Sequence, residues 1–374
     1  MRKKAQGKEK ENKYFDYSLL FIVIFLLCFG LVMLYSSSSY TSATKYGDAA
    51  RYLKLQLRNI ALGSAALIFF ATQDYRKWRK FGFVAYIGTF ILCVIVLIPG
   101  IGSSSHGSSR WLSLGPVSFQ PSEIAKLAVI IFLATIIEKI PKQMGKISTL
   151  GKIILIMLPI FGVIAKTNLS TAVIVFGICV CMFFVASPKY WHFVLVGGLG
   201  IVLVLIFIFA AGYRGDRVAA WLHPETAGDG GYQTLMGLYA IGSGGLFGKG
   251  LGESLQKLGN VPESQNDMIF TIICEELGLF GAVCVILLFI LLLWRMMVIA
   301  NNAQDLFGSL IVVGIMSHIA IQVILNIAVV TNTIPNTGVI LPFISYGGTS
   351  IIFLMAEMGL ALSVSKGIRL ENID

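Results

Sequence analysis

The sequence predicts an all-α polytopic membrane protein with about ten transmembrane helices and one large extracytoplasmic loop. Apolar residues make up 56% of the chain and charged residues only 13%, about half the charged share of a soluble domain. The mean hydropathy is +0.81. Apolar runs of roughly 17 or more residues recur, each long enough to cross a hydrocarbon core of ~30 Å as a helix. The sequence lacks the short alternating strands that would indicate a transmembrane β-barrel.

The apolar runs predict ten spans in chain order. They lie at residues 18–36, 57–72, 81–99, 120–138, 150–165, 169–187, 191–212, 269–294, 307–330 and 348–365. The fifth run is the weakest, because it is short and contains Pro159, so a tight hairpin with the sixth run is an alternative to two full crossings. Most of the 29 Lys and Arg residues fall on one side of this arrangement, which predicts that both termini are cytoplasmic.

The two ends of the chain are predicted to be cytoplasmic tails. Residues 1–16 form a basic tail, residues 17–366 the membrane domain, and residues 367–374 a second tail. No small-residue cleavage site follows the basic start, which argues against a removed signal peptide. The net charge of +10 is therefore placed largely in solvated segments, and no nucleic-acid partner is predicted.

Three extracytoplasmic segments are more than ordinary connections. Residues 100–119 are rich in Gly and Ser and then become amphipathic. Residues 213–268 form a loop far longer than ~15 residues, with too many apolar and aromatic residues for disorder. Residues 331–347 are half apolar with two prolines, which predicts a re-entrant or surface-lying segment. Because all three lie on one side, we expect the functional site there.

Cysteine and histidine give no sign of a structural metal. All six cysteines fall inside apolar runs and are interpreted as small buried apolar side chains, not as a disulfide framework. The four histidines are scattered without the spacing of metal ligands.

An acidic pair precedes the eighth span. Glu263 and Asp267 lie four residues apart in "PESQNDMIF", and they share one face if the helix starts near residue 263. An acid beside hydrocarbon costs ~3 kcal/mol and tends to mark a site, so Asp267 is predicted to be functional. Capping of the helix explains Glu263 equally well. Glu275 and Glu276, two turns deeper, are interpreted as structural.

Basic residues on the same side are candidates for binding an anionic substrate. Arg214 and Arg217 open the large loop with guanidinium groups that suit phosphate, although snorkelling at a helix end explains them equally well. Lys249 and Lys257 lie in a Gly-rich stretch that lacks the spacing of a nucleotide-binding loop. Arg110 lies at the same surface.

Polar residues also occur inside the predicted spans. Glu123 and Lys126 are separated by three residues on the fourth span, and both a packing ion pair and the lining of a functional cavity explain them. His318, Gln322 and Asn326 repeat every four residues on the ninth span. Such a polar stripe faces protein or a wet groove, and we interpret it as a source of interhelical hydrogen bonds.

Four long segments resemble the SEDS family, whose branches include FtsW, RodA and SpoVE. They are "RWLSLGPVSFQPSEIAKL" (110–127), "GYQTLMGLYAIGSGGLFGKGLG" (231–252), "VPESQNDMIFTIICEELGLFG" (261–281) and "PNTGVILPFISYGGTS" (335–350). The segments follow the order of the family, and "LPFISYGGTS" is most similar to FtsW, the cell-division branch. The resemblance implies a ten-helix fold.

The resemblance also implies an activity and its partners. It implies a peptidoglycan glycosyltransferase that polymerises lipid II, an undecaprenyl-pyrophosphoryl disaccharide-pentapeptide, at the outer face of the bacterial cytoplasmic membrane for septal wall synthesis. Asp267 matches the essential aspartate of the family. The expected partners are a class B penicillin-binding protein transpeptidase and other divisome membrane proteins. RodA-like elongation and SpoVE-like spore-wall synthesis are the alternatives within the family.

The chain departs from the family pattern at several polar positions. They are Asn168, Ser264, Gln265, Asn266, Asn332 and Asn336. These departures leave open which polar groups surround Asp267.

The candidate residues fit the chemistry of this reaction. Pyrophosphate is a good leaving group, so the reaction needs no strong general acid, unlike glycoside hydrolysis. It needs a base for the 4-hydroxyl of the acceptor and cations for the pyrophosphate, and we assign the base to Asp267 in a single inverting displacement. The candidate substrate-binding residues are Arg214, Arg217, Lys257, Glu263, Arg110, Glu123, Lys126 and Lys249. No cofactor is certain, and a divalent cation, Mg²⁺ or Mn²⁺, held by Asp267 or Glu263 stays open.

The main alternative from another functional class is a lipid II flippase or transporter whose intramembrane charges line the transport path. Transporters often contain inverted repeats, and no convincing repeat is found in this sequence. The polar residues instead concentrate in loops on one side, which favours an enzyme. A non-catalytic scaffold for division proteins is the third hypothesis.

Overall fold

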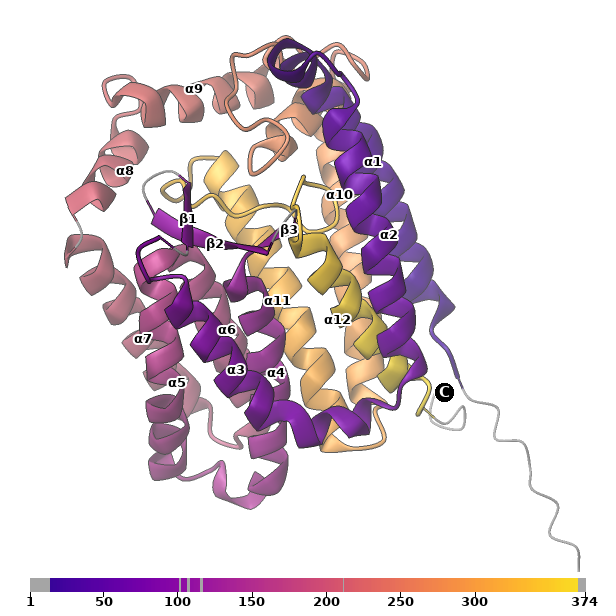
Figure 1. Ribbon diagram of the computed structural model, residues 1–374, viewed down its shortest axis with the longest axis vertical. Helices are drawn as coiled ribbons and strands as arrows, with labels where there is room; N and C mark the ends of the chain where they lie inside the picture. The colour runs from indigo at the N-terminus through magenta and orange to yellow at the C-terminus, as the bar shows by residue number, and fades with distance from the viewer. Residues whose placement is uncertain (1–13, 101, 106–107, 115–116, 211, 369–374) are drawn as a thin grey trace, which may run out of the picture.

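The computed structural model describes residues 14–100, 102–105, 108–114, 117–210 and 212–368. Long helices stand side by side in a bundle, and two further helices, α8 (Gly212–Leu222) and α9 (Gly228–Ser243), lie at one end of it (Figure 1). We call this end of the bundle the loop end. The opposite end, where the described chain begins and stops, is the terminal end (Figure 1).

A helix occupies each of the ten predicted spans. These helices are α1 (Tyr17–Tyr46), α2 (Arg51–Thr72), α3 (Gly82–Ile95) after the 3-10 turn η1 (Tyr75–Phe81), α4 (Pro121–Lys139), α5 (Ile147–Thr167), α6 (Leu169–Ala186), α7 (Tyr190–Ala210), α10 (Ile269–Asn301), α11 (Leu306–Val330) and α12 (Ser350–Ser365); a short 3-10 turn, η2 (Pro141–Gln143), joins α4 to α5. Among the described residues, seven segments are long and apolar enough to cross a membrane. The protein is therefore a multi-pass helical membrane protein.

The helices differ in how deeply they are buried. In α11, 67% of the most apolar stretch is buried inside the protein, against 22% for the segment formed by η1 and α3. Helix α11 therefore lies at the centre of the bundle, while α3 presents most of its apolar surface outward, as a lipid-facing helix does. The polar stripe on α11 consequently faces protein and not lipid.

The fifth and sixth spans are two full helices, so the tight-hairpin alternative is wrong. Helix α5 runs through Pro159 over 21 residues, and α6 follows directly with 18. Asn168 separates them, and its side-chain carbonyl accepts a hydrogen bond from the backbone N–H of Thr171 at 3.2 Å. This N-cap lets α6 begin immediately after α5 ends.

A small antiparallel sheet lies at the loop end, and the sequence did not predict it. Its strands are β1 (Gly102–Ser105), β2 (Ser108–Leu114) and β3 (Val117–Phe119), in the order β1-β2-β3. Leu112 pairs with Gly102 on one side and with Phe119 on the other. Gly and Ser have low intrinsic preference for strands, so pairing decides their conformation here.

The long loop is seated on a break in α10. Gly278 leaves helical geometry there, with φ 67° and ψ −166°. The carbonyls of Glu275 and Glu276 on one side of the break accept hydrogen bonds from the backbone N–H groups of Lys249 and Gly250, each at 3.0 Å. Backbone N–H groups just past the break donate back to the loop. The loop thus supplies the hydrogen-bond partners that the backbone of a broken membrane helix needs.

The segment between α11 and α12 enters the protein, as the re-entrant alternative predicted. Residues 341–345 are all buried although none is helical. Their backbone packs on α1 at Gly30, where a Cβ atom would lie 2.6 Å from the carbonyl oxygen of Phe343. Only glycine permits this approach, so α1 and the re-entrant segment, residues 331–349, are fitted to each other.

Candidate active site

The acidic pair lies in a turn and not on a helix. Helix α10 begins at Ile269, and Glu263 has a positive φ of 55°, which is outside the right-handed helical region. The backbone N–H of Asn266 donates to the carbonyl of Glu263 at 2.9 Å, which closes the turn. The prediction that Glu263 and Asp267 share one helical face is therefore wrong, because the conformation of Glu263 delays the start of the helix.

Asp267 is an acid buried at the loop end. Its side chain belongs to a residue that is only 7% exposed, and its Oδ1 has no hydrogen-bond partner among the described residues. The other oxygen, Oδ2, lies beside Gly338 of the re-entrant segment, where a Cβ atom would be 3.9 Å away. A carboxylate held this way has an oxygen free to accept a proton.

The surroundings of Asp267 tune its proton affinity. The pKa of Asp267 is raised to about 7, mainly by burial, and the negative charge of Glu263 contributes to this rise. The positive charge of Arg217 and the backbone N–H groups of Asp267 and Met268 act in the opposite direction. A base with a pKa near neutrality combines substantial ionisation with useful basicity, which is what proton abstraction requires.

Arg217 is the predicted cation that the structure brings close to Asp267. It lies exposed on α8 and donates through Nη1 to the carbonyl of Asn336 at 3.3 Å. The side-chain oxygen of Asn336 in turn accepts from the backbone N–H of Gly338 at 3.0 Å. The side chain of Arg214, on the same helix, lies outside the part of the chain that the structure describes in detail.

Lys249 and Lys257 are engaged in ion pairs with the acids of α10. Lys257 donates from Nζ to Glu276 at 2.8 Å, to Ser36 at 3.0 Å and to the carbonyl of Gly252 at 2.6 Å. Lys249 pairs with Glu275 at 2.6 Å. These pairs fit the structural interpretation of the two glutamates, which stays a prediction. Contact of either lysine with pyrophosphate stays a prediction, and it requires a carboxylate of α10 to lose its partner.

Glu123 and Lys126 form the packing ion pair that the sequence offered as one of two explanations. Their charged atoms are 2.8 Å apart at the start of α4, and both residues are buried. Ser350, at the start of α12, donates to the free oxygen of Glu123 at 2.5 Å. The pair thereby joins α4 to α12, and the lining of a substrate cavity stays a prediction for these residues.

Arg110 lies in β2 and reaches the end of α5. Its Nε donates to the carbonyl of Thr167 at 2.9 Å. It therefore fixes the small sheet on the bundle at the loop end, and its role in substrate binding stays a prediction.

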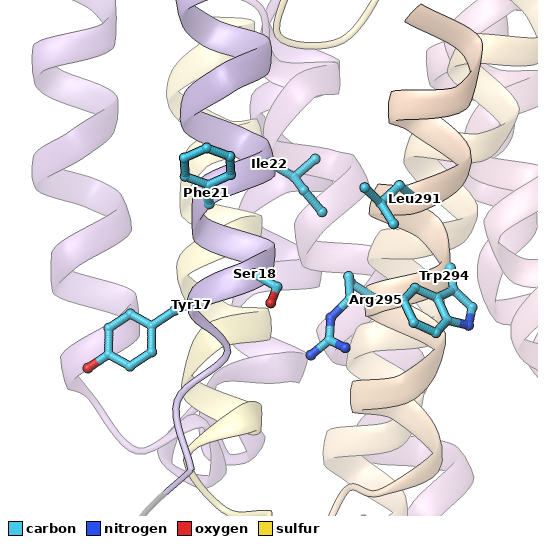
Figure 2. Close-up of a pocket in the computed structure, with 7 residues that line it drawn as sticks. All are labelled: Tyr17, Ser18, Phe21, Ile22, Leu291, Trp294 and Arg295. Carbon is cyan, nitrogen blue, oxygen red and sulfur yellow. The ribbon is translucent and has the colours of Figure 1, made fainter. Parts of the chain in front are cut away.

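The cavities on the surface of the described bundle include one at each end. One lies at the terminal end, where α1 and α10 face each other across about 450 Å³ and Arg295 points between the helices (Figure 2). The second measures about 570 Å³ and lies between α1, α2 and the long loop, with Ser36 and Lys257 at its polar side. Only the second shares the loop end with Asp267.

Sequence reasoning missed the residues that frame Asp267. Gly338 carries no charge, so no single-sequence signal marks it, and Asn336 was noted only as a departure from the family pattern. Trp221 was also missed; its Nε1 donates to the carbonyl of Asn332 at 3.0 Å, and Asn332 returns a hydrogen bond to the carbonyl of Trp221 at 3.3 Å. These bonds attach α8 to the re-entrant segment and thereby place Arg217.

The residues near Asp267 are compatible with one divalent cation. The described residues contain no group of three or more His, Cys, Asp or Glu side chains that could hold a metal. Mg²⁺, however, is often bound by one or two carboxylates together with substrate phosphates. The unpartnered Oδ1 of Asp267 and the nearby charge of Glu263 fit that second arrangement.

Comparison with known proteins agrees with a multi-pass helical membrane protein. Residues 17–369 match the family model FtsW/RodA/SpoVE, described as "Cell cycle protein". The chain belongs to this family, the SEDS family. It is 41% identical to stage V sporulation protein E of Bacillus subtilis, over 94% of this chain and 97% of the relative. It is 36% identical to the probable peptidoglycan glycosyltransferase FtsW of the same organism, over 96% and 93%.

Solved structures share the fold over nearly the whole chain. One, from work on the structural coordination of polymerization and crosslinking by a peptidoglycan synthase complex, has a TM-score of 0.79 at 26% identity and covers 96% of this chain and 99% of that chain. The rod shape determining protein RodA of Thermus thermophilus has a TM-score of 0.71 at 25% identity, over 95% and 98%.

Proposed function

We propose that this protein is a peptidoglycan glycosyltransferase that polymerises lipid II into β-1,4 glycan strands for septal wall synthesis. Relatives at 34–36% identity are named probable peptidoglycan glycosyltransferase FtsW. The observation that carries the proposal is Asp267, a buried carboxylate with one unpartnered oxygen and a pKa raised to about 7 by burial. Both termini lie in the cytoplasm in this proposal, so the loop end faces outward.

Asp267 acts as the general base of a single displacement. Its carboxylate takes the proton of the acceptor 4-hydroxyl as that oxygen attacks the anomeric carbon of the donor. The bond from this carbon to pyrophosphate breaks, the pyrophosphate leaves with the bonding electrons, and the α-linked donor becomes a β-1,4 linkage. Because pyrophosphate is a stable anion, one carboxylate suffices where a glycosidase needs two.

Cationic groups at the loop end hold the leaving group. Arg217 is exposed, and among the described residues it donates to one backbone carbonyl at 3.3 Å, so its remaining donors are available to a phosphate. Arg214 is proposed to assist it. A divalent cation held by Asp267 or Glu263 is the alternative to these side chains, and it would neutralise pyrophosphate charge in their place.

Lipid anchors and a protein partner complete the proposal. The cavity of about 570 Å³ between α1, α2 and the long loop has the size and apolar lining to take part of a prenyl chain. A class B penicillin-binding protein is the proposed partner, with other division proteins. A chain of this fold has been solved in a peptidoglycan synthase complex that joins polymerization to crosslinking, which supports this partnership.

Purified protein and labelled lipid II test the proposal directly. Asp267→Asn removes the base and is expected to lower the polymerisation rate by ~10²-fold or more. Asp48→Asn is the matched control, since Asp48 lies near the loop end of α1 but pairs with Lys54 at 2.8 Å in solvent. Full activity of a folded Asp267→Asn protein would exclude the base assignment. Movement of lipid II across vesicles without strand formation would instead favour a flippase.

Spore-wall synthesis is a second candidate role. It is favoured by the 41% identity to stage V sporulation protein E, against 36% to FtsW of the same organism. Expression in Bacillus subtilis strains that lack one or the other relative separates the roles. Rescue of sporulation alone would assign the protein to the spore wall, and rescue of division would assign it to the septum.

A further inference from the structure

Asn326 of α11 contacts two backbone carbonyls, one of Asp267 itself and one of the re-entrant segment. Its side-chain Nδ2 donates to the carbonyl of Asp267 at 2.8 Å and to the carbonyl of Val339 at 2.7 Å. Asn326 is fully buried, so both bonds form without competition from solvent. One amide group therefore ties the turn that carries the acid to the re-entrant segment that packs against it.

Gln322 makes a similar contact with the re-entrant segment one turn earlier in α11. Its Nε2 donates to the carbonyl of Ile340 at 3.0 Å, which fixes the orientation of the amide. The amide oxygen of Gln322 consequently faces His318 Nε2, at 2.8 Å, and this ring nitrogen must carry a proton. The other ring nitrogen, Nδ1, forms a hydrogen bond with Glu357 of α12 at 2.8 Å.

These contacts hold consecutive backbone groups of the re-entrant segment. Val339 is bound by Asn326, Ile340 by Gln322, and Gly338, the residue before them, lies against Asp267 Oδ2. The polar stripe on α11 therefore sets the gap between the acid and the backbone that covers it. Ordinary helix packing does not need two buried amides aimed at adjacent carbonyls, since each amide costs ~1–3 kcal/mol if left unpaired.

We propose that Asn326 is a positioning residue for the Asp267 base, supported one turn away by Gln322 and the His318–Glu357 pair. This inference rests on the proposed function, because it assigns Asn326 a role through Asp267. Asn326 does not touch substrate. It keeps the carboxylate of Asp267 buried and keeps it next to Gly338 of the re-entrant segment.

Loss of the amide has a consequence that a merely structural residue would not have. Freed from Asn326, the turn and the re-entrant segment separate, and water reaches Asp267. Burial is the main cause of the raised pKa of Asp267, so hydration moves this pKa toward its usual range. The charged groups that act on Asp267, namely Glu263 and Arg217, stay in the chain. The acid limb of the pH–rate profile therefore moves to lower pH.

Asn326→Leu tests the proposal, since leucine keeps the shape and removes both donors. We expect a rate loss of ~10²-fold for a displaced base and an acid limb lower by roughly one pH unit. Asn302→Leu is the control: Asn302 also donates to a carbonyl, that of Val298 at 2.9 Å, but at the terminal end. It is expected to keep the wild-type rate and profile.

Gln322→Met provides a milder variant if Asn326→Leu fails to fold, and it should shift the profile in the same direction by less. A folded Asn326→Leu protein with the wild-type rate would overturn the proposal. So would a slower protein with an unchanged acid limb, because that result describes a structural residue. Failure of the proposed function is seen separately, as full activity in Asp267→Asn.

Discussion

At the scale of single residues, the pKa of Asp267 responds to two nearby charges. Glu263 raises its pKa and Arg217 lowers it, around a value of about 7 that is set mainly by burial. A carboxyl group with a raised pKa is protonated below that pH and ionised above it. A general base must be ionised, so the polymerisation rate is expected to rise as the pH increases through about 7.

Substitution of the two charged neighbours is expected to move the acid limb of the pH–rate profile, the part where the rate rises with pH, in opposite directions. Glu263→Gln removes a charge that raises the pKa of Asp267, so the limb moves to lower pH. Arg217→Gln removes a charge that lowers it, so the limb moves to higher pH, and it also weakens pyrophosphate binding. The measurement is the rate of strand formation from labelled lipid II between pH 5.5 and 8.5, about 1.5 units either side of neutrality.

Glu253→Gln is the control for these two variants, since Glu253 is an exposed acid of the same loop. It should leave the profile in place. Shifts of the same sign in Glu263→Gln and Arg217→Gln would contradict the assignment of the limb to Asp267.

At the scale of elements, two irregular segments are held by close backbone contacts with helices. The long loop fills the break of α10 at Gly278, and the re-entrant segment rests on α1 at Gly30. Ion pairs reinforce the first contact, since Lys249 and Lys257 bind the acids just before the break. The base therefore lies where the long loop meets the re-entrant segment, and the position of the re-entrant segment depends on α1, a helix far away in sequence.

Gly30→Ala is expected to destabilise the protein and to lower its activity. The added Cβ would lie 2.6 Å from the carbonyl oxygen of Phe343 and 2.8 Å from the Cα of Ile344, and backbone cannot move aside as a side chain can. Overpacking of this kind costs ~1–3 kcal/mol. The melting temperature of the detergent-solubilised protein measures the loss, alongside the polymerisation rate.

Gly88→Ala serves as the matched substitution. Gly88 lies in α3 with nothing within 4 Å of its added Cβ, and alanine is the better helix former. Its melting temperature should be unchanged or higher. An equal, small effect of both substitutions would show that the contact of α1 with the re-entrant segment is loose.

At the scale of the whole molecule, the two ends of the bundle have different characters. The loop end carries Asp267, the small sheet and the helices α8 and α9 (Figure 1). The terminal end carries ion pairs between arginines and acids, and in one of them, that of Asp16, the acid is fully buried. They are Arg76–Asp305 at 2.8 Å, Arg79–Glu138 at 2.6 Å and Arg295–Asp16 at 2.6 Å. Basic residues anchored at one end predict that this end faces the cytoplasm.

Cysteine labelling in intact cells tests this orientation. In a chain whose six cysteines are replaced by alanine, Leu251→Cys at the loop end should react with an impermeant maleimide, since residue 251 is exposed. Gln143→Cys, exposed at the terminal end, should react only after the membrane is opened. The reverse pattern would place Asp267 in the cytoplasm and exclude polymerisation at the outer face.

Much of the fold could be predicted from the sequence, because membrane helices are specified locally. A run of apolar residues must become a helix in lipid, whatever its neighbours are. All ten predicted spans correspond to helices in the structure, and differences are confined mainly to their ends. The pairing of Glu275 and Glu276 with polar neighbours also followed from local reasoning, since an acid at that depth requires a partner.

The sequence by itself determined the membrane class, the order of the helices and the polar stripe of α11, and it marked Asp267 as the candidate base. Only the tertiary structure decided that Glu263 lies in a turn and not in a helix, that Gly338 lies beside the carboxylate of Asp267, and that Lys257 is bound to Glu276. The physical reason is the range of the forces. Hydropathy acts on each segment separately, whereas the burial and pairing of a charge depend on residues that only folding brings together.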